Sequence, residues 1–197
     1  GAKQSLANAI LALVDVGDEV IIPAPFWVSY SELVKIAGGV PVIVRTAMEN
    51  KYKITAQQLE ESITERSKVV LFSSPCNPSG AVYSKDELKQ LAAVLENHSN
   101  ISIISDEIYE YINFVGHHES IAQFQNVKDR VIIVNGLSKG FAMTGYRLGY
   151  IAANPMVAKA CEKIQGQFTS GANAITQRAA ITALTTDLRP SIEMTKE

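Results

Sequence analysis

The sequence predicts an α/β protein in which a mainly parallel sheet is covered by helices on both faces, giving three layers in the order α/β/α. Short apolar runs alternate with amphipathic segments along the whole chain, and this alternation is typical of parallel sheets. Of the 197 residues, 47% are hydrophobic, which is enough to fill the core of one large domain. We therefore expect one α/β domain over the chain.

Six apolar runs have the length and the flanking turn residues of β-strands. The first runs into the sequence PAP, and the third breaks at SSPCNPSG. The predicted strands are 19–22, 40–45, 69–73, 101–105, 131–134 and 148–153.

Helical periodicity and capping residues place helices between these strands. Residues 55–58 and 84–87 each fit a capping box, and the pair Gly38-Gly39 fits a left-handed helix end. The predicted helices are 1–14, 27–36, 55–63, 84–96, 155–165 and 173–185, and a further helical pattern begins in PSIEMTKE.

Charge and composition exclude several classes of partner. A net charge of −2 predicts neither a nucleic-acid site nor attraction to an anionic membrane surface. No stretch approaches the ~20 apolar residues that a membrane span requires. Cys76 and Cys161 lie far apart without CxxC spacing, which favours free thiols in a reducing compartment. We expect a cytoplasmic protein.

Polar residues follow three successive predicted strands. Asn77, Asp106 and Lys139 come after the runs 69–73, 101–105 and 131–134. Ligands of parallel sheets bind beyond the carboxyl ends of the strands, so we expect these three side chains at the same edge.

A carboxylate at the end of an apolar strand is costly to bury without a positive partner. Asp106 therefore requires a cation from the protein or from a ligand, unless it acts as the N-cap of a following helix. Its neighbour Glu107 points elsewhere and is interpreted as a helix-start charge.

Lys139 is either a solvated loop charge or a buried amine that acts as a nucleophile. Arg147 follows eight residues later, and its planar guanidinium is suited to a phosphate or carboxylate. Together with Asp106, the two cations describe a site for a molecule with a carbonyl, a phosphate and a protonatable ring nitrogen. Pyridoxal phosphate has all three.

Five ordered motifs over nearly the whole chain strengthen this interpretation. They are GAKQ at 1–4, PFWVSY at 25–30, SSPCNPSGAVYS at 73–84, SDEIYEY at 105–111 and GLSKGFAMTGYRLG at 136–149. In this order they resemble the class I aminotransferases, which are pyridoxal-phosphate enzymes of fold type I. The resemblance is closest to the bacterial aspartate aminotransferase branch.

The resemblance implies a role for each matching residue. Lys139 would hold the cofactor as an internal aldimine and move a proton between the substrate Cα and the cofactor C4′. Asp106 would keep the pyridine nitrogen protonated. Trp27 would stack on the ring of the cofactor. Asn77 would donate a hydrogen bond to its phenolic oxygen, and so would Tyr109, which is expected on the same helical side as Asp106. The phosphate contacts would come from Arg147, Ser138 and the backbone N–H groups of Ala2 and Lys3.

Trp27 and Asn77 are also the substrate contacts that the resemblance implies, and it implies cis peptide bonds before Pro25 and Pro78. Without the resemblance, Trp27 reads as a core residue and Tyr109 as a surface aromatic. The run 77–80 is a good β-turn in either case. We expect no metal site, because adjacent histidines such as His117-His118 in a polar loop are usually solvated.

The implied reaction transfers the amino group of aspartate to 2-oxoglutarate, giving oxaloacetate and glutamate. Enzymes of this family are longer and act as homodimers, so residues 1–197 would form most of the large, cofactor-binding domain. An N-terminal segment and a small domain would then be missing, and the chain alone would be inactive. Phe168, between the last two predicted helices, is either an interface contact or a core plug.

Three alternatives use the same fold or cofactor. An aromatic aminotransferase or a carbon–sulfur β-lyase would use the same residues on another substrate, and a cofactor-binding sensor domain of a transcription regulator would keep the cofactor without catalysis. A nicotinamide-dependent Rossmann enzyme fits the sequence poorly, because no G-x-G-x-x-G follows the early strands and Lys139 would have no task.

Overall fold

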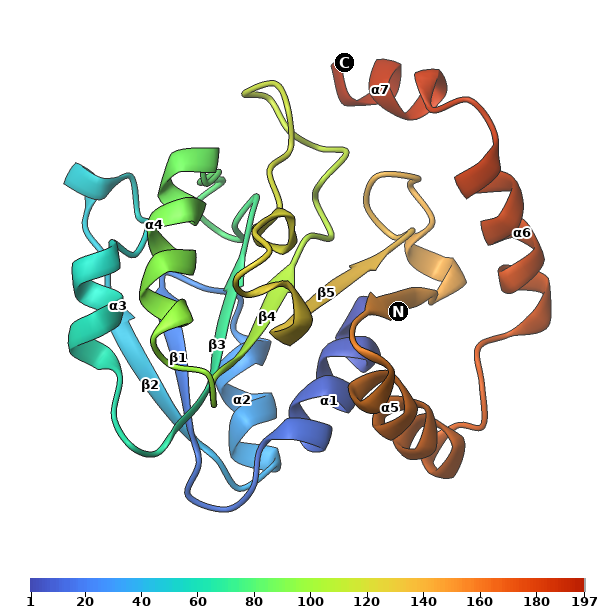
Figure 1. The fold of residues 1–197 in the computed structure, drawn as a ribbon. Helices are drawn as coiled ribbons and strands as arrows, with labels where there is room; N and C mark the ends of the chain where they lie inside the picture. The colour runs from blue at the N-terminus through green and yellow to red at the C-terminus, as the bar shows by residue number, and fades with distance from the viewer. Residues whose placement is uncertain (197) are drawn as a thin grey trace.

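The computed structural model describes residues 1–196 and has the predicted three-layer α/β/α architecture (Figure 1). A six-stranded sheet in the order β2-β1-β3-β4-β5-β6 forms the middle layer. Its strands are β1 Glu19–Ala24, β2 Val40–Arg45, β3 Ser67–Ser73, β4 Ser102–Asp106, β5 Val131–Gly136 and β6 Gly149–Ala152. Strands β1 to β5 pair in parallel, and only β6 is antiparallel to its neighbour β5 within this sheet.

Helices cover both faces of the sheet, because parallel strands are joined by crossovers that pack back onto it. Figure 1 shows α3 and α4 on one face and α1 and α2 on the other. Two hydrophobic clusters fill the spaces between the layers, one under each set of helices. The helices are α1 Ala2–Leu13, α2 Ser29–Ile36, α3 Ala56–Ser62, α4 Lys85–Glu96, α5 Pro155–Phe168, α6 Ala174–Thr185 and α7 Arg189–Lys196.

In the described part of the chain, four short 3-10 helices lie in the connections, at Met48–Asn50, Ile121–Gln123, Lys128–Arg130 and Thr144–Tyr146. No helix within residues 1–196 has the length and hydrophobicity of a membrane-spanning segment.

The local signals in the sequence predicted several helix ends correctly. Thr55 and Ser84 each form a complete capping box, with Gln58 and Glu87 as the reciprocal partners. Gly38 has φ of +85°, the left-handed conformation expected after α2. The peptide bonds before Pro25 and Pro78 are cis as predicted, and the bond before Pro75 is also cis, which was not predicted.

Two expectations about local structure are wrong. No helix follows Asp106, since the chain forms turns there, with the amide of Glu110 bonded to the carbonyl of Glu107. Phe168 is the last residue of α5 and is 68% exposed, so it is not a core plug. Helix α5 is longer than predicted, because it continues through Gly166 to Phe168 and the amide of Thr169 still bonds to the carbonyl of Gln165.

The start of α1 packs directly on the start of β6. A Cβ atom at Gly149 would lie 2.3 Å from the backbone nitrogen of Ala2, so only a glycine permits this approach. The contact joins the first helix to the last strand of the sheet, and it brings the N-terminus of α1 next to Arg147.

We predict that Gly149→Ala destabilises the protein by about 1–3 kcal/mol, because an added methyl group in a closely packed site forces the backbone to shift. Urea unfolding measures the change. Gly166→Ala is the matched control, since a Cβ at Gly166 meets open space and alanine is the better helix residue. Equal unfolding midpoints for Gly149→Ala and the parent protein would contradict the predicted packing.

Candidate active site

A cavity of about 210 Å³ opens at the carboxyl end of the central strands. All nine residues selected from the sequence line it, although they come from five separate segments of the chain. They are Ala2, Lys3, Trp27, Asn77, Asp106, Tyr109, Ser138, Lys139 and Arg147; Leu6, Tyr30, Ile108 and Thr144 complete the wall.

Asp106 is the last residue of β4 and only 4% exposed. Side chains alternate between the two faces of a strand, so Asp106 lies with Ile104 on the face covered by α1 and α2. Tyr30 donates its hydroxyl proton to Oδ2 at 2.6 Å, and the amide of Ile108 donates to Oδ1 at 3.2 Å. The N-cap interpretation of Asp106 is therefore wrong, because its carboxylate caps a turn and not a helix.

Burial raises the pKa of Asp106 to about 6, although the hydrogen bonds from Tyr30 and Ile108 act in the opposite direction. The negative charge of Glu107 raises it further. No ion pair within residues 1–196 involves Asp106. The carboxylate thus faces the cavity without the cation that its burial requires.

Asn77 and Tyr109 form a polar pair on another wall of the cavity. The Asn77 amide donates to the Tyr109 hydroxyl at 3.4 Å, so both groups point to the same place. Tyr109 reaches the cavity from a turn, not from the helical side that the sequence predicted. Its ring is half-buried and contributes to the wall, so it is not simply a surface aromatic.

Lys139 follows β5 and is exposed, so it is not the buried amine that one interpretation of the sequence required. Its ammonium nitrogen nevertheless lies over the ring of Tyr109, 5.7 Å from the centroid, and borders the cavity. Ser138, the preceding residue, is 9% exposed and lines the same wall.

Arg147 and the N-terminus of α1 concentrate positive charge at one end of the cavity. Arg147 adopts a left-handed conformation with φ of 55°, and its guanidinium donates to the carbonyl of Thr144 at 2.7 Å. A Cβ at Gly1 would lie 2.6 Å from Arg147 Nη2, so the guanidinium closely covers the first turn of α1. A helix N-terminus carries free N–H groups and a partial positive charge, so this end suits an anion.

Trp27 stands at the cavity wall immediately before α2. Its ring meets the ring of Tyr30 edge-on at 5.7 Å, and the ammonium of Lys3 lies 4.7 Å from its centroid. Trp27 therefore packs partly against the core, as its core interpretation predicts, and also borders the cavity. The Lys3 side chain contributes to this wall, whereas the sequence assigned a role only to its backbone.

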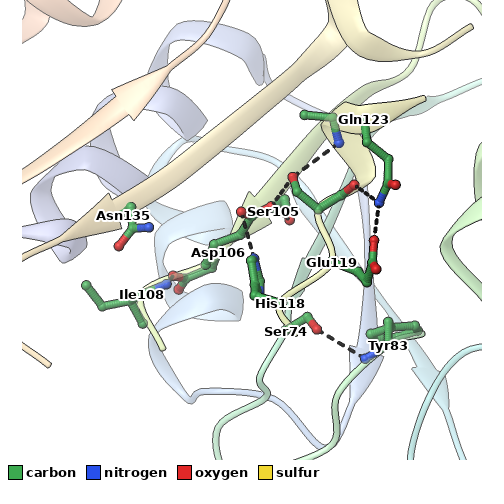
Figure 2. A network of polar contacts seen from close by, with 12 residues as sticks. Ser74, Tyr83, Ser105, Asp106, Ile108, His118, Glu119, Gln123 and Asn135 are labelled. Atoms are coloured by element: carbon green, nitrogen blue, oxygen red, sulfur yellow. Dashed lines mark hydrogen bonds and ion pairs between the residues drawn. The ribbon is translucent and has the colours of Figure 1, made fainter. Parts of the chain in front are cut away.

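A second polar network lies behind the cavity, on the opposite face of β4. Glu107 is 3% exposed and accepts three hydrogen bonds, from Ser105 at 2.9 Å, His118 at 3.0 Å and Ser120 at 2.6 Å. Figure 2 shows His118 pointing back toward the end of β4, where Ser105 and Asp106 lie. Glu107 points away from the cavity as predicted, but it is a buried acceptor and not a helix-start charge.

The adjacent histidines His117 and His118 differ in their exposure to solvent. His117 is exposed, whereas the side chain of His118 is only 14% exposed and is not solvated as predicted. One ligand atom each of Glu107, Glu110 and His118 lies within 4.8 Å of the others, a spacing that a metal ion could use. The three hydrogen bonds to Glu107 already satisfy its carboxylate, so we describe this cluster as a hydrogen-bond network.

Comparison with known proteins is consistent with this geometry. A family model described as aminotransferase class I and II matches residues 1–197. The chain belongs to this family. A bifunctional aspartate aminotransferase and glutamate/aspartate-prephenate aminotransferase of Petunia hybrida is 48% identical over 93% of this chain and 39% of its own length. An aspartate aminotransferase of Bacillus sp. strain YM-2 is 47% identical over 93% of this chain and 47% of its own length.

Solved structures of aminotransferases share the fold. The aspartate aminotransferase of Rhizobium meliloti superposes with a TM-score of 0.97 and 41% identity, covering all of this chain and 50% of that one. An aromatic aminotransferase of Pyrococcus horikoshii OT3 gives a TM-score of 0.95 and 37% identity, covering all of this chain and 53% of that one. The fold is therefore that of fold-type I aminotransferases, and the chain spans about half the length of the relatives it matches.

The sequence missed four residues that line the cavity of this aminotransferase-family chain. Tyr30 is the most consequential, because it is the partner of Asp106. It lies in the PFWVSY motif three residues after Trp27, a spacing that would have placed both side chains on one side of a helix turn. Leu6, Ile108 and Thr144 carried no signal that separates a cavity wall from a core or loop residue.

The pKa of His118 generates a prediction about stability. Burial by itself lowers this pKa, but the hydrogen bond and negative charge of Glu107, with the charges of Glu110 and Glu119, outweigh burial and raise it. A raised pKa in the folded state means that the stabilisation is fully present below the ordinary value of 6.5 and is lost as the pH rises through the raised value.

We therefore expect His118→Gln to lower the free energy of unfolding by about 1 kcal/mol more at pH ~6 than at pH ~8.5. A charged imidazolium donates a stronger hydrogen bond to Glu107 than a neutral imidazole does, and solvent screening of the partly exposed pair keeps the difference small. Urea unfolding at both pH values measures the difference. His117→Gln, an exposed neighbour, is the control and should show no such dependence. An equal loss at both pH values for His118→Gln would contradict the ion pair.

Proposed function

We propose that the protein containing this chain is a pyridoxal-phosphate-dependent aminotransferase that transfers the amino group of aspartate to 2-oxoglutarate, forming oxaloacetate and glutamate. The convergence of the nine sequence-selected residues on one cavity carries this proposal. The names of the relatives that are 43–48% identical, aspartate and aspartate/prephenate aminotransferases, support the choice of substrate.

The residues present fit the cofactor at both ends of the cavity. Asp106 offers a buried carboxylate without an ion-pair partner among residues 1–196, and a protonated ring nitrogen would supply the missing cation. Arg147 and the first turn of α1 offer a guanidinium and free backbone N–H groups, which match a phosphate. The glycine at position 1 leaves room for the guanidinium at this end.

When bound, pyridoxal phosphate would supply an aldehyde that accepts an amino group and a protonated ring that withdraws electrons from the reacting carbon. Lys139 would hold the cofactor covalently and, once released, would remove and return the proton at the substrate Cα. Its exposed position at the cavity border leaves the amine free to move between these two tasks.

The other side chains would bind and orient. Asn77 and Tyr109 would donate hydrogen bonds to the phenolic oxygen of the cofactor, and their mutual contact holds them side by side for this purpose. Trp27 would stack on the ring, and Trp27 and Asn77 would also border the substrate. Ser138, with Ala2 and Lys3, would complete the phosphate contacts.

Several properties belong to the whole protein and are part of the same proposal. We infer that residues 1–197 form the cofactor-binding large domain, because the chain spans about half of its relatives. A homodimer is supported by apolar residues that α6 exposes, with Ile175 at 77% and Ile181 at 52%. A cytoplasmic location is supported by the two free cysteines, Cys76 and Cys161.

Trapping the cofactor with borohydride in the full-length protein tests the proposal. We expect one phosphopyridoxyl group on the peptide that contains Lys139, and none there in Lys139→Ala. Transamination from aspartate to 2-oxoglutarate should be lost in the same variant. Labelling scattered over surface lysines would overturn the cofactor assignment.

Substrate choice is tested separately with the same protein. Because relatives are named for prephenate and a structural neighbour for aromatic amino acids, the assay includes prephenate as acceptor and tyrosine as donor. Cofactor labelling at Lys139 with the highest kcat/KM for tyrosine would favour an aromatic aminotransferase. Labelling without any transamination would favour a carbon–sulfur lyase or a sensor domain.

We predict that Arg147→Lys weakens cofactor binding about tenfold, because lysine cannot form the two parallel hydrogen bonds that a guanidinium makes to phosphate. Fluorescence titration of the apo protein with pyridoxal phosphate measures the Kd. Arg66→Lys is the control, since Arg66 is exposed at the opposite end of the sheet and pairs with Glu19. Equal Kd values for Arg147→Lys and the parent would contradict the phosphate role.

A further inference from the structure

The hydroxyl of Tyr30 is the only side-chain donor to Asp106 within residues 1–196. We propose that Tyr30 is a positioning residue, which holds the Asp106 carboxylate ionised and correctly oriented so that it can keep a proton on the ring nitrogen of the cofactor. This inference rests on the proposed function, because it concerns how the chain prepares Asp106 for pyridoxal phosphate.

Tyr30 is fixed firmly enough for this task. It is 1% exposed, in the first turn of α2, and its hydroxyl points across the interface to the end of β4. The ring of Phe26 stacks nearly parallel to it at 6.4 Å with an interplanar angle of 13°, and the ring of Trp27 packs on its edge. A side chain held on two sides by aromatic rings gives the hydroxyl one direction, which is toward Oδ2.

The carboxylate depends on this donor because its surroundings supply little else. The second oxygen, Oδ1, accepts only the amide of Ile108, at 3.2 Å. Neither oxygen has a cationic partner within residues 1–196, and Glu107 places a second negative charge next in the chain. Hydrogen bonds to an ionised carboxylate lower its free energy relative to the neutral acid, so loss of the Tyr30 bond favours protonation of Asp106.

The direction of donation is also fixed. Burial, and then the charge of Asp106 and the hydrogen bond to it, raise the pKa of the Tyr30 phenol well above 10. Tyr30 therefore keeps its proton at neutral pH and donates it to the ionised Asp106. Because this donor is neutral, it holds the Asp106 carboxylate in place and does not compete with the protonated ring nitrogen for the ion pair.

The test uses the full-length protein loaded with pyridoxal phosphate carrying ¹⁵N in the ring. The ¹⁵N chemical shift reports directly whether the ring nitrogen is protonated, so its titration gives a readout that is independent of turnover. We expect the midpoint of this titration to fall in Tyr30→Phe and to fall further in Asp106→Asn. The kcat should drop about tenfold to a hundredfold in Tyr30→Phe, the range for losing a hydrogen bond to a charged group, with KM for aspartate little changed.

Tyr83→Phe is the matched control. Tyr83 is also buried, at 3% exposed, and its hydroxyl accepts the amide of Ile54, but it lies in the other core cluster and does not border the cavity. This variant should leave both the ¹⁵N titration and kcat unchanged. Incorporation of 3-fluorotyrosine at position 30 provides a second test, because its more acidic hydroxyl donates more strongly and should raise the midpoint.

The outcomes separate the inference from the proposed function. If the wild-type protein is labelled at Lys139 and Tyr30→Phe titrates as the wild type does, the role of Tyr30 is overturned and the proposed function stands. If Tyr30→Phe does not fold, the protein with 3-fluorotyrosine at position 30 decides, and an unchanged midpoint of its ¹⁵N titration overturns the role of Tyr30. If the wild-type protein does not take up the cofactor at Lys139, both fail together.

Discussion

A buried carboxylate at the end of the central strand β4 is the interaction on which the site depends. Asp106 is only 4% exposed, and among residues 1–196 one phenol and one backbone amide stabilise its ionised form. These two donors do not replace the hydration that a carboxylate loses on burial, so its pKa rises to about 6. The chain is thereby prepared for a ligand with a positive charge at this point, and the other walls of the cavity are arranged around that requirement.

The alternation of side chains along β4 explains why two adjacent acidic residues have different tasks. Asp106 faces α1 and α2 and the cavity, whereas Ser105 and Glu107 face the other side, where His118 and Ser120 satisfy Glu107. The second network fixes the return of the chain after Tyr109 without entering the cavity. One strand end thus supports both the chemistry of the cavity and the loop that forms one of its walls.

The opposite end of the cavity depends on backbone contact. The first turn of α1 reaches the guanidinium of Arg147 because glycines at positions 1 and 149 remove the Cβ atoms that would separate them. This approach joins residues almost 150 positions apart, and it combines a helix N-terminus with a guanidinium as one region of positive charge. Arg147 and Asp106 thus give the wall of one cavity both a cation and a buried carboxylate.

The sequence by itself determined the α/β class, the positions of the six strands, both capping boxes and four residues of the cavity wall, because hydrophobic period, cap chemistry and strand ends are local properties. Five more residues of the wall followed from the resemblance of its ordered motifs to a known family. It did not determine the structure after β4, where the helix expected after Asp106 is a turn held by the Ile108 amide. It also missed Tyr30 as the partner of Asp106 and Glu107 as a buried acceptor. Both contacts join side chains from different elements: Tyr30 reaches Asp106 from α2, and Ser120 reaches Glu107 from the loop after β4. Only tertiary packing decides such contacts.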